Sequence, residues 1–246
     1  MTDKTRKVAI VTGASRGIGA AIAERLARDD FAVVVNYLAS ASPAEALAGK
    51  IKANGGSALA VRADVADSAS VQAMFEATEK AFGGIDALVN NAGIMMLAKV
   101  ADSDDAMLDR QIAVNLKGTF YGMREAARRM RNGGRIVNFS TSVVGTKLET
   151  YSVYAATKAA VETMTAILSK ELRGRNITVN AVAPGPVTTE LFLEGKSPEL
   201  VERMAKMNPM ERIGTPEDIA SVVSFLLGPD GGWVNGQVLR ANGGMV

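Results

Sequence analysis

Short runs of apolar, often β-branched residues alternate with longer amphipathic stretches along the chain. In the longer stretches apolar residues recur every three or four positions, as Ile18, Ile22 and Leu26 do, and this spacing is typical of helices. We expect strands over residues 8–11, 31–35, 58–61, 85–89, 135–139, 177–182 and 237–240. We expect helices over residues 17–29, 43–54, 67–82, 104–131 with a break near Asn115, 151–172, 199–207 and 216–227.

This alternation predicts right-handed βαβ units and therefore a parallel sheet. The expected strands are apolar at nearly every position, which indicates that helices cover both faces of the sheet. The fold class is therefore α/β, a three-layer Rossmann-type doubly wound sheet of about seven strands. We see no linker or repeat and expect one dinucleotide-binding catalytic domain over residues 1–246. An irregular stretch at about 188–214, which contains methionines and is bounded by Pro and Gly, is expected to form a substrate lid.

The amino-acid composition limits which catalytic groups and metal sites the protein can have. The 246 residues include no Cys and no His, which excludes disulfides, thiolate nucleophiles, Cys/His zinc sites and Ser-His-Asp machinery, and we expect no metal site. A proton donor must then be Tyr, Lys, Asp, Glu or a relayed water. The net charge of +2 and the short apolar runs give no reason to expect a nucleic-acid or membrane partner. The charged N-terminus lacks the pattern of a signal peptide, so we expect a cytoplasmic protein.

A glycine-rich turn joins the first expected strand to the first expected helix. Gly13 permits the tight turn, Gly17 lets the backbone approach a diphosphate, and Gly19 lets the helix lie close to the sheet. The free N–H groups at the helix N-terminus favour an anion. The turn therefore predicts a dinucleotide site with contacts from Gly13, Ser15, Arg16, Gly17, Ile18 and Gly19.

The end of the second strand indicates which dinucleotide is bound. NAD-binding proteins usually carry Asp or Glu there, whereas this chain has Asn36, Tyr37 and, slightly later, Ser40. A carboxylate would repel a 2′-phosphate, and its absence removes that penalty. Arg16 and Ser40 are the candidate phosphate contacts, so the sequence favours NADP(H).

Tyr154 is followed four residues later by Lys158 on an expected helix, and this spacing places both side chains on one face. A cation near a phenol lowers the pKa of the phenol from its usual value of about 10. A Tyr tuned in this way can give a proton to a carbonyl, or take one in the reverse direction. Tyr154 is therefore the leading acid/base candidate.

Taken together, these motifs resemble the short-chain dehydrogenase/reductase family over essentially the whole chain. The nearest pattern is that of 3-oxoacyl carrier-protein reductases and tetrahydroxynaphthalene reductases. The matching residues, in order, are Thr12, Gly13, Gly17, Ile18, Gly19, Asp64, Val65, Asn90, Asn91, Ala92, Gly93, Asn115, Tyr154, Lys158, Pro184 and Gly185.

The resemblance implies roles for residues that the spacing alone leaves unassigned. Asp64 and Val65 would flank the adenine, and Asn90 would steady the central strand. The segment Asn91, Ala92 and Gly93 would pass under the cofactor ribose. Lys158 would hold the nicotinamide ribose and lower the Tyr154 pKa, and Asn115 would hold a water that relays protons to Lys158. After Pro184 and Gly185, Val187 and Thr189 would bind the carboxamide.

One position departs from the family pattern, which places a Ser about thirteen residues before the Tyr. Here that position is Thr141, whereas matching the Ser-Val-Val-Gly wording of some relatives selects Ser142. Either hydroxyl could polarise a carbonyl oxygen. If the strand continues, the two residues point to opposite faces, so both cannot reach the site. We favour Thr141 and keep Ser142 as the alternative.

The expected reaction is NADP(H)-dependent reduction of a ketone to a secondary alcohol, with a 3-oxoacyl thioester as one possible substrate. The alternatives are an NAD-dependent dehydrogenase of a sugar, polyol or steroid, and a non-catalytic NADP-binding scaffold. Candidate pocket residues, which could equally pack a core or lid, are Met95, Met96, Tyr151, Leu191, Phe192, Met204 and Met207. By resemblance we expect a homotetramer or dimer built on helices 104–131 and 151–172.

Overall fold

The computed structural model describes residues 6–195 and 197–246. Within these residues seven strands form one parallel sheet in the order β3-β2-β1-β4-β5-β6-β7. The strands are β1 (Lys7–Val11), β2 (Phe31–Tyr37), β3 (Ser57–Arg62), β4 (Ala87–Asn90), β5 (Arg135–Phe139), β6 (Thr178–Pro184) and β7 (Val238–Ala241). The predicted fold class is confirmed, and each expected strand agrees with an observed one to within about two residues at either end.

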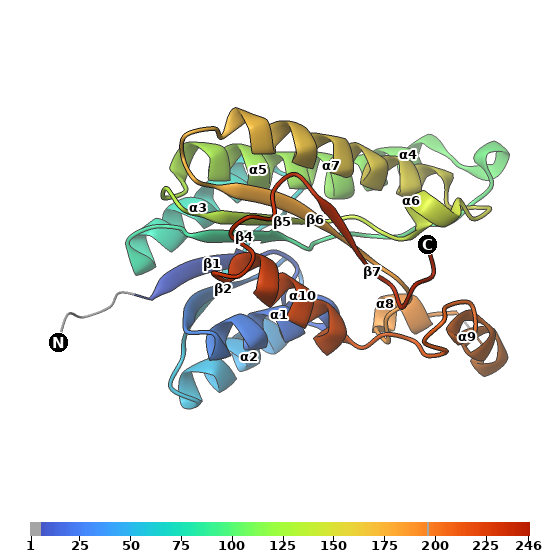
Figure 1. Cartoon of the computed structure of the whole chain (residues 1–246), viewed down its shortest axis with the longest axis horizontal. Coiled ribbons are helices and arrows are strands. Elements are labelled where there is room, and N and C mark those ends of the chain that lie inside the picture. The colour runs from blue at the N-terminus through green and yellow to red at the C-terminus, as the bar shows by residue number, and fades with distance from the viewer. Residues whose placement is uncertain (1–5, 196) are drawn as a thin grey trace.

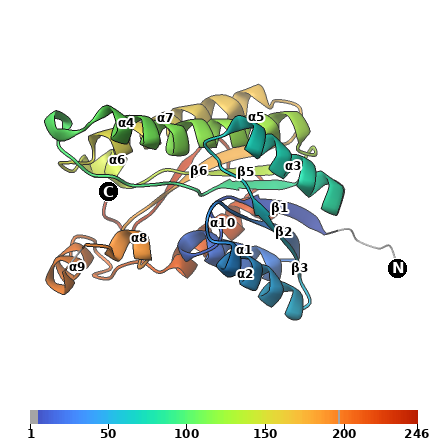
Figure 2. The same cartoon turned by 180° about the vertical axis from the view of Figure 1, so that it is seen from behind.

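Helices cover both faces of the sheet, as the apolar strands predict. Figures 1 and 2 show α1, α2 and α10 on one face and α3, α4, α5 and α7 on the other. The longer helices are α1 (Gly17–Arg28), α2 (Ala41–Ala53), α3 (Ser68–Phe82), α5 (Gly118–Arg129), α7 (Ser152–Glu171) and α10 (Pro216–Leu227). The shorter helices are α4 (Asp105–Gln111), α6 (Val143–Thr146), α8 (Glu190–Leu193) and α9 (Pro198–Ala205), with the 3₁₀ turn η1 (Val100–Asp102) and the π-helix η2 (Ile112–Lys117).

The core is divided into two layers by the sheet. Successive residues of β1 contribute to opposite layers, with Ala9 and Val11 packed in the layer of α1 and α10, and Ile10 packed in the layer of α3 and α5. All three side chains are fully buried. A strand buried on both faces must be apolar throughout, because alternate side chains point into different layers.

The strand order places the binding cleft. β1 lies between β2 and β4. The strands β2 and β3 are added on one side of β1, and the strands from β4 to β7 are added on the other side. In open α/β sheets, ligands bind at the carboxyl ends of the strands beside such a switch point. The glycine-rich turn after β1 and the segment after β4 meet at this place.

Two regions differ from the sequence expectation in detail. The 104–131 stretch is not interrupted near Asn115; it passes from α4 through the π-helix η2 into α5. Within the 188–214 stretch, α9 corresponds to the helix expected over residues 199–207, whereas the short helix α8 was not expected. The ends of this stretch lie side by side, because Val187 and Gly214 form a parallel β-bridge. Within the described residues, the helices are all too short or too polar to cross a bilayer.

Candidate active site

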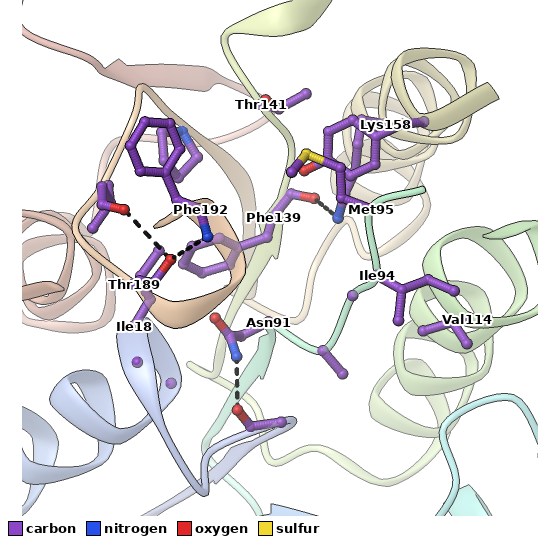
Figure 3. A pocket seen from close by; sticks show the side chains of 18 of the residues that line it. Ile18, Asn91, Ile94, Met95, Val114, Phe139, Thr141, Lys158, Thr189 and Phe192 are labelled. Carbon is purple, nitrogen blue, oxygen red and sulfur yellow. Dashed lines mark hydrogen bonds between the residues drawn. The ribbon is translucent and has the colours of Figure 1, made fainter. Parts of the chain in front are cut away.

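A cavity of about 730 Å³ opens at the carboxyl ends of the strands. Figure 3 shows Ile18 and Asn91 at one end of the view and Thr141, Lys158 and Met95 at the other. The cavity brings together every cofactor residue expected from the sequence: Gly13, Ser15, Arg16, Gly17, Ile18, Gly19, Asn36, Tyr37, Ser40, Asp64, Val65, Asn91, Ala92, Gly93, Tyr154, Lys158, Pro184, Gly185, Val187 and Thr189. Residues that lie far apart in sequence therefore share one concave surface of a size typical of cofactor sites.

The glycine turn packs against the end of β4 without room for side chains. Gly13 has φ +63°, and a Cβ there would lie 2.9 Å from the Ala92 Cα. A Cβ on Gly19 would lie 2.5 Å from the Gly13 carbonyl oxygen. The Asn91 amide ties the two segments together by donating to the carbonyls of Thr12 (2.8 Å) and Gly13 (3.1 Å). The close approach keeps the N-terminus of α1 open to a ligand.

Asn36 supports the turn rather than presenting its amide to the ligand. Its side chain is buried, and its Oδ1 accepts a 3.1 Å hydrogen bond from the Gly13 N–H. Its Nδ2 donates to the carbonyls of Val61 and Ala63 at the end of β3. Although Asn36 lines the cavity, its polar atoms have protein partners. We expected Asn36 to contact the cofactor, whereas its side chain supports the glycine turn that lines the cofactor site.

Arg16, Tyr37 and Ser40, the residues expected near a 2′-phosphate, all line the cavity. The Arg16 Nη1 lies 2.7 Å from the Glu190 Oε2 on α8. Both side chains are mostly exposed, and Glu190 also lines the cavity. Arg16 is thus within the site but already has an acidic partner, which could not be predicted because Glu190 lies 174 positions away in the sequence.

Tyr154 and Lys158 lie one turn apart on α7, with the Lys158 Nζ 6.0 Å from the centre of the Tyr154 ring. Burial raises the pKa of Tyr154 to about 12, although the nearby Thr141 hydroxyl acts in the opposite direction. Burial lowers the pKa of Lys158 to about 8. We expected Lys158 to lower the Tyr154 pKa, but burial of the phenol has the largest effect on this pKa and raises it. At neutral pH Tyr154 is therefore the protonated, donor form.

Thr141 and Ser142 have different surroundings. The Thr141 hydroxyl lies near enough to the Tyr154 phenol to lower the pKa of the phenol, and both Thr141 and Ser142 line the cavity. The Ser142 hydroxyl donates to the Ala183 carbonyl (3.3 Å) and accepts from the Asn242 Nδ2 (2.9 Å). β5 ends at Phe139, so strict alternation of faces no longer applies here. This geometry favours Thr141 for the carbonyl oxygen and gives Ser142 an anchoring contact.

Asn115 lies outside the set of cavity-lining residues but close to Lys158. The Asn115 amide exchanges two 2.9 Å hydrogen bonds with the backbone of Ile94. A Cβ on Gly93 would lie 3.3 Å from the Asn115 Oδ1 and 3.5 Å from the Lys158 Nζ, so the two groups flank Gly93. The Lys158 Nζ itself donates to the Phe139 carbonyl at 2.8 Å (Figure 3). A relay from Asn115 to Lys158 would have to pass beside Gly93.

The substrate end of the cavity has an apolar lining. Met95, Tyr151, Phe192, Met204 and Met207 line it as expected, whereas Met96 lies outside the lining set and the Leu191 side chain lies outside the described residues. The sequence analysis missed Arg110, Thr146, Leu148 and Met245, which also line it. These four residues stand outside any motif, so their spacing gave no signal.

The residues present fit a dinucleotide. The glycine turn leaves a cradle that any side chain would fill, and the N-terminus of α1 supplies N–H groups and a partial positive charge for a diphosphate. Asp64, Val65, Tyr154 and Lys158 line the same cavity as the glycine turn. This is the site of a dinucleotide-dependent oxidoreductase.

Comparison with known proteins gives the family. Residues 13–246 match the family described as Enoyl-(Acyl carrier protein) reductase. The NADPH-dependent aldehyde reductase-like protein, chloroplastic, of Arabidopsis thaliana is 44% identical over 98% of this chain and 94% of its own length. Versicolorin reductase 1 of Aspergillus parasiticus is 39% identical over 99% of both chains. A short-chain dehydrogenase from Burkholderia cenocepacia J2315, solved in complex with NADP, matches with a TM-score of 0.93 at 37% identity, with 99% of each chain covered. The chain belongs to the short-chain dehydrogenase/reductase family, as the motifs indicated.

Proposed function

We propose that the protein uses NADPH to reduce a ketone or a related carbonyl compound to an alcohol. The observation that carries this proposal is that Thr141, Tyr154 and Lys158 line the same cavity as the glycine-rich turn. Two hydroxyls that converge at this place can hold one carbonyl oxygen. Tyr154 supplies its proton, because its pKa of about 12 keeps the phenol protonated at neutral pH.

Each residue has a separate task in this reaction. When bound, NADPH supplies the hydride that adds to the carbonyl carbon. Tyr154 gives its proton to the carbonyl oxygen, and Thr141 donates a hydrogen bond to the same oxygen. The phenolate left on Tyr154 is stabilised by the nearby Lys158 ammonium and regains its proton from solvent through the Lys158 side of the site.

NADP(H) is the cofactor that the adenine end of the site supports. Within that end, Arg16 provides a cation and the end of β2 carries no carboxylate that would repel a 2′-phosphate. The Arabidopsis relative is named as NADPH-dependent, and the Burkholderia structure contains NADP. Asp64 and Val65 would hold the adenine, and Val187 and Thr189 the carboxamide.

The substrate class is open to a direct test. The relatives reported above are named as an NADPH-dependent aldehyde reductase-like protein and as versicolorin reductase 1, and the matched family is described as Enoyl-(Acyl carrier protein) reductase. We would follow loss of NADPH with a small diketone, an aromatic aldehyde, a short 3-oxoacyl thioester and an enoyl thioester. Turnover of any carbonyl compound by the wild type, lost in Tyr154→Phe, supports the proposal. Turnover of the enoyl thioester alone would overturn it.

We also propose assembly into a homotetramer or dimer. Leu108 on α4, Phe120 on α5 and Ile167 on α7 expose large apolar side chains, with Ile167 50% exposed. Burial of such residues between copies would remove them from water. Light scattering after size exclusion would give the mass of the assembly. The expected cytoplasmic location stays a prediction, and the Arabidopsis relative is named as chloroplastic.

A further inference from the structure

The segment 242–246, which follows β7, lies against the loop that carries Thr141. The Asn242 Nδ2 donates a 2.9 Å buried hydrogen bond to the Ser142 hydroxyl, next in sequence to Thr141. Asn242 is itself buried, and its Cα would lie 2.9 Å from a Cβ on Gly185, so it has little freedom to move. Figure 1 shows this end of the chain between α6 and α8.

The Asn242 side chain also folds the rest of the segment around itself. Its Oδ1 accepts from the backbone N–H groups of Gly244 (3.0 Å) and Met245 (3.2 Å), and its Nδ2 donates to the Val246 carbonyl (3.2 Å). Gly243 and Gly244 have φ of +67° and +86°, which allows the chain to turn back on itself. The result directs Met245 into the lining of the cavity.

The same segment touches both walls of the substrate end. A Cβ on Gly145 of α6 would lie 2.5 Å from the Val246 Cγ2. On the lid side, a Cβ on Gly243 would lie 2.5 Å from the Asn208 Oδ1. A Cβ on Gly244 would lie 3.2 Å from the Pro209 Cδ. The segment therefore bridges the Thr141 loop and the end of the lid stretch.

From this geometry we propose that segment 242–246 is part of the active site, with Asn242 as a positioning residue and Met245 as a determinant of substrate size. Asn242 fixes Ser142, whose second contact is the Ala183 carbonyl, and thereby holds the neighbouring Thr141 hydroxyl toward Tyr154. Met245 limits the width of the pocket that receives the carbonyl compound. The proposal rests on the proposed carbonyl reduction, because Thr141 must have an oxygen to polarise.

Four variants separate the two tasks. Ser142→Ala removes the hydroxyl that Asn242 holds and should lower kcat about 10- to 100-fold for all substrates. Complete loss of an oxygen-polarising donor lowers kcat roughly 10²- to 10³-fold, whereas here the Thr141 hydroxyl is present but displaced. Met245→Ala widens the pocket, so its effect is measured as the ratio of kcat/KM between two ketones of different size. It should raise kcat/KM for a bulky aromatic ketone about tenfold relative to the diketone. Asn242→Ala removes both the anchor and the fold of the segment, and should show both effects.

Asn235→Ala is the matched control. Asn235 also lies in the last part of the chain and holds β6 through a 2.8 Å bond from the Val179 N–H, but it lies outside the lining set. We expect it to change neither kcat nor the ratio between the two ketones. Ser142→Thr, which restores a hydroxyl, should recover kcat, and all variants should bind NADPH with a Kd within twofold of the wild type.

The outcomes are distinct. If Ser142→Ala and Asn242→Ala keep wild-type kcat, or if Asn235→Ala loses as much as they do, Asn242 has no positioning role. If Met245→Ala leaves the ratio between the ketones unchanged, Met245 does not set substrate size, and this variant remains informative should Asn242→Ala fail to fold. If the wild type reduces none of the carbonyl compounds, the proposed function fails instead.

Discussion

Arg16 and Glu190 form an ion pair across the mouth of the cavity, with the Arg16 Nη1 2.7 Å from the Glu190 Oε2 and 174 positions between them in sequence. Arg16 belongs to the glycine turn and Glu190 begins α8, so the pair joins the adenine end of the site to the lid stretch. The two side chains are 71% and 76% exposed. Such pairs contribute little to stability, so Arg16 can exchange Glu190 for another anion at small cost.

This pair predicts opposite effects of two substitutions on cofactor affinity. Arg16→Ala should raise the Kd for NADPH about 10- to 100-fold, because a hydrogen bond to a charged group contributes roughly 1.5–3 kcal/mol. Glu190→Gln should lower the Kd for NADPH severalfold, because the 2′-phosphate no longer competes with a carboxylate. The Kd for NADH should change little in both. Fluorescence titration of the two cofactors measures all four values, and equal changes for NADH and NADPH would exclude Arg16 as the phosphate contact.

Tyr154→Phe should reduce kcat at least about 10²- to 10⁴-fold, the usual contribution of general acid catalysis. The Kd for NADPH should stay within twofold, because the ring and the Lys158 contact to Phe139 remain. Stopped-flow and steady-state measurements on the best carbonyl substrate of the panel provide the test. A Phe variant with undiminished turnover would remove Tyr154 from the chemistry.

Thr141 can be tested without disturbing the cavity wall. Thr141→Val keeps the shape but removes the hydroxyl, and should lower kcat about 10²- to 10³-fold, as loss of one oxyanion donor does elsewhere. Thr141→Ser restores the hydroxyl and should keep kcat within about tenfold of the wild type. If both variants lose activity equally, shape rather than hydrogen bonding explains the effect.

Lys158 predicts a pH dependence of stability. Its pKa is about 8 in the folded protein and 10.5 ordinarily, because burial disfavours the ammonium form. Between these pH values the unfolded chain binds more protons at this site than the folded protein. The contribution of Lys158 to the free energy of unfolding therefore rises with pH from about 8 toward 10.5.

Lys158→Met should remove this rise. We expect the wild type to gain stability relative to the variant as the pH increases from 8 to 10, measured by urea denaturation at each pH. Parallel curves would mean that Lys158 has an ordinary pKa in the folded protein. Tyr154, whose pKa is raised to about 12, acts in the opposite direction, and mainly above pH 10.

Much of the fold could be predicted because its signals are local. Apolar periodicity locates the seven strands and the long helices, and the glycine turn is a short contiguous motif. The Tyr154–Lys158 spacing likewise depends only on one helical turn. The π-helix at Asn115 could not be predicted, because the Asn115 amide bonds to the backbone of Ile94, which lies 21 positions away in the sequence and comes close only in the folded chain.

The amino-acid sequence by itself therefore determined which segments are strands and which are helices, and it determined the glycine turn, the Tyr154–Lys158 pair and the absence of an acid at the end of β2. Each of these features is encoded within a few neighbouring residues. Tertiary structure alone decided that Asn36 supports the turn, that the Ser142 hydroxyl bonds to Asn242, and that Arg16 pairs with Glu190. It also brought Met245 into the cavity. These contacts join residues from distant elements, and their partners are fixed only when the sheet and its helices pack.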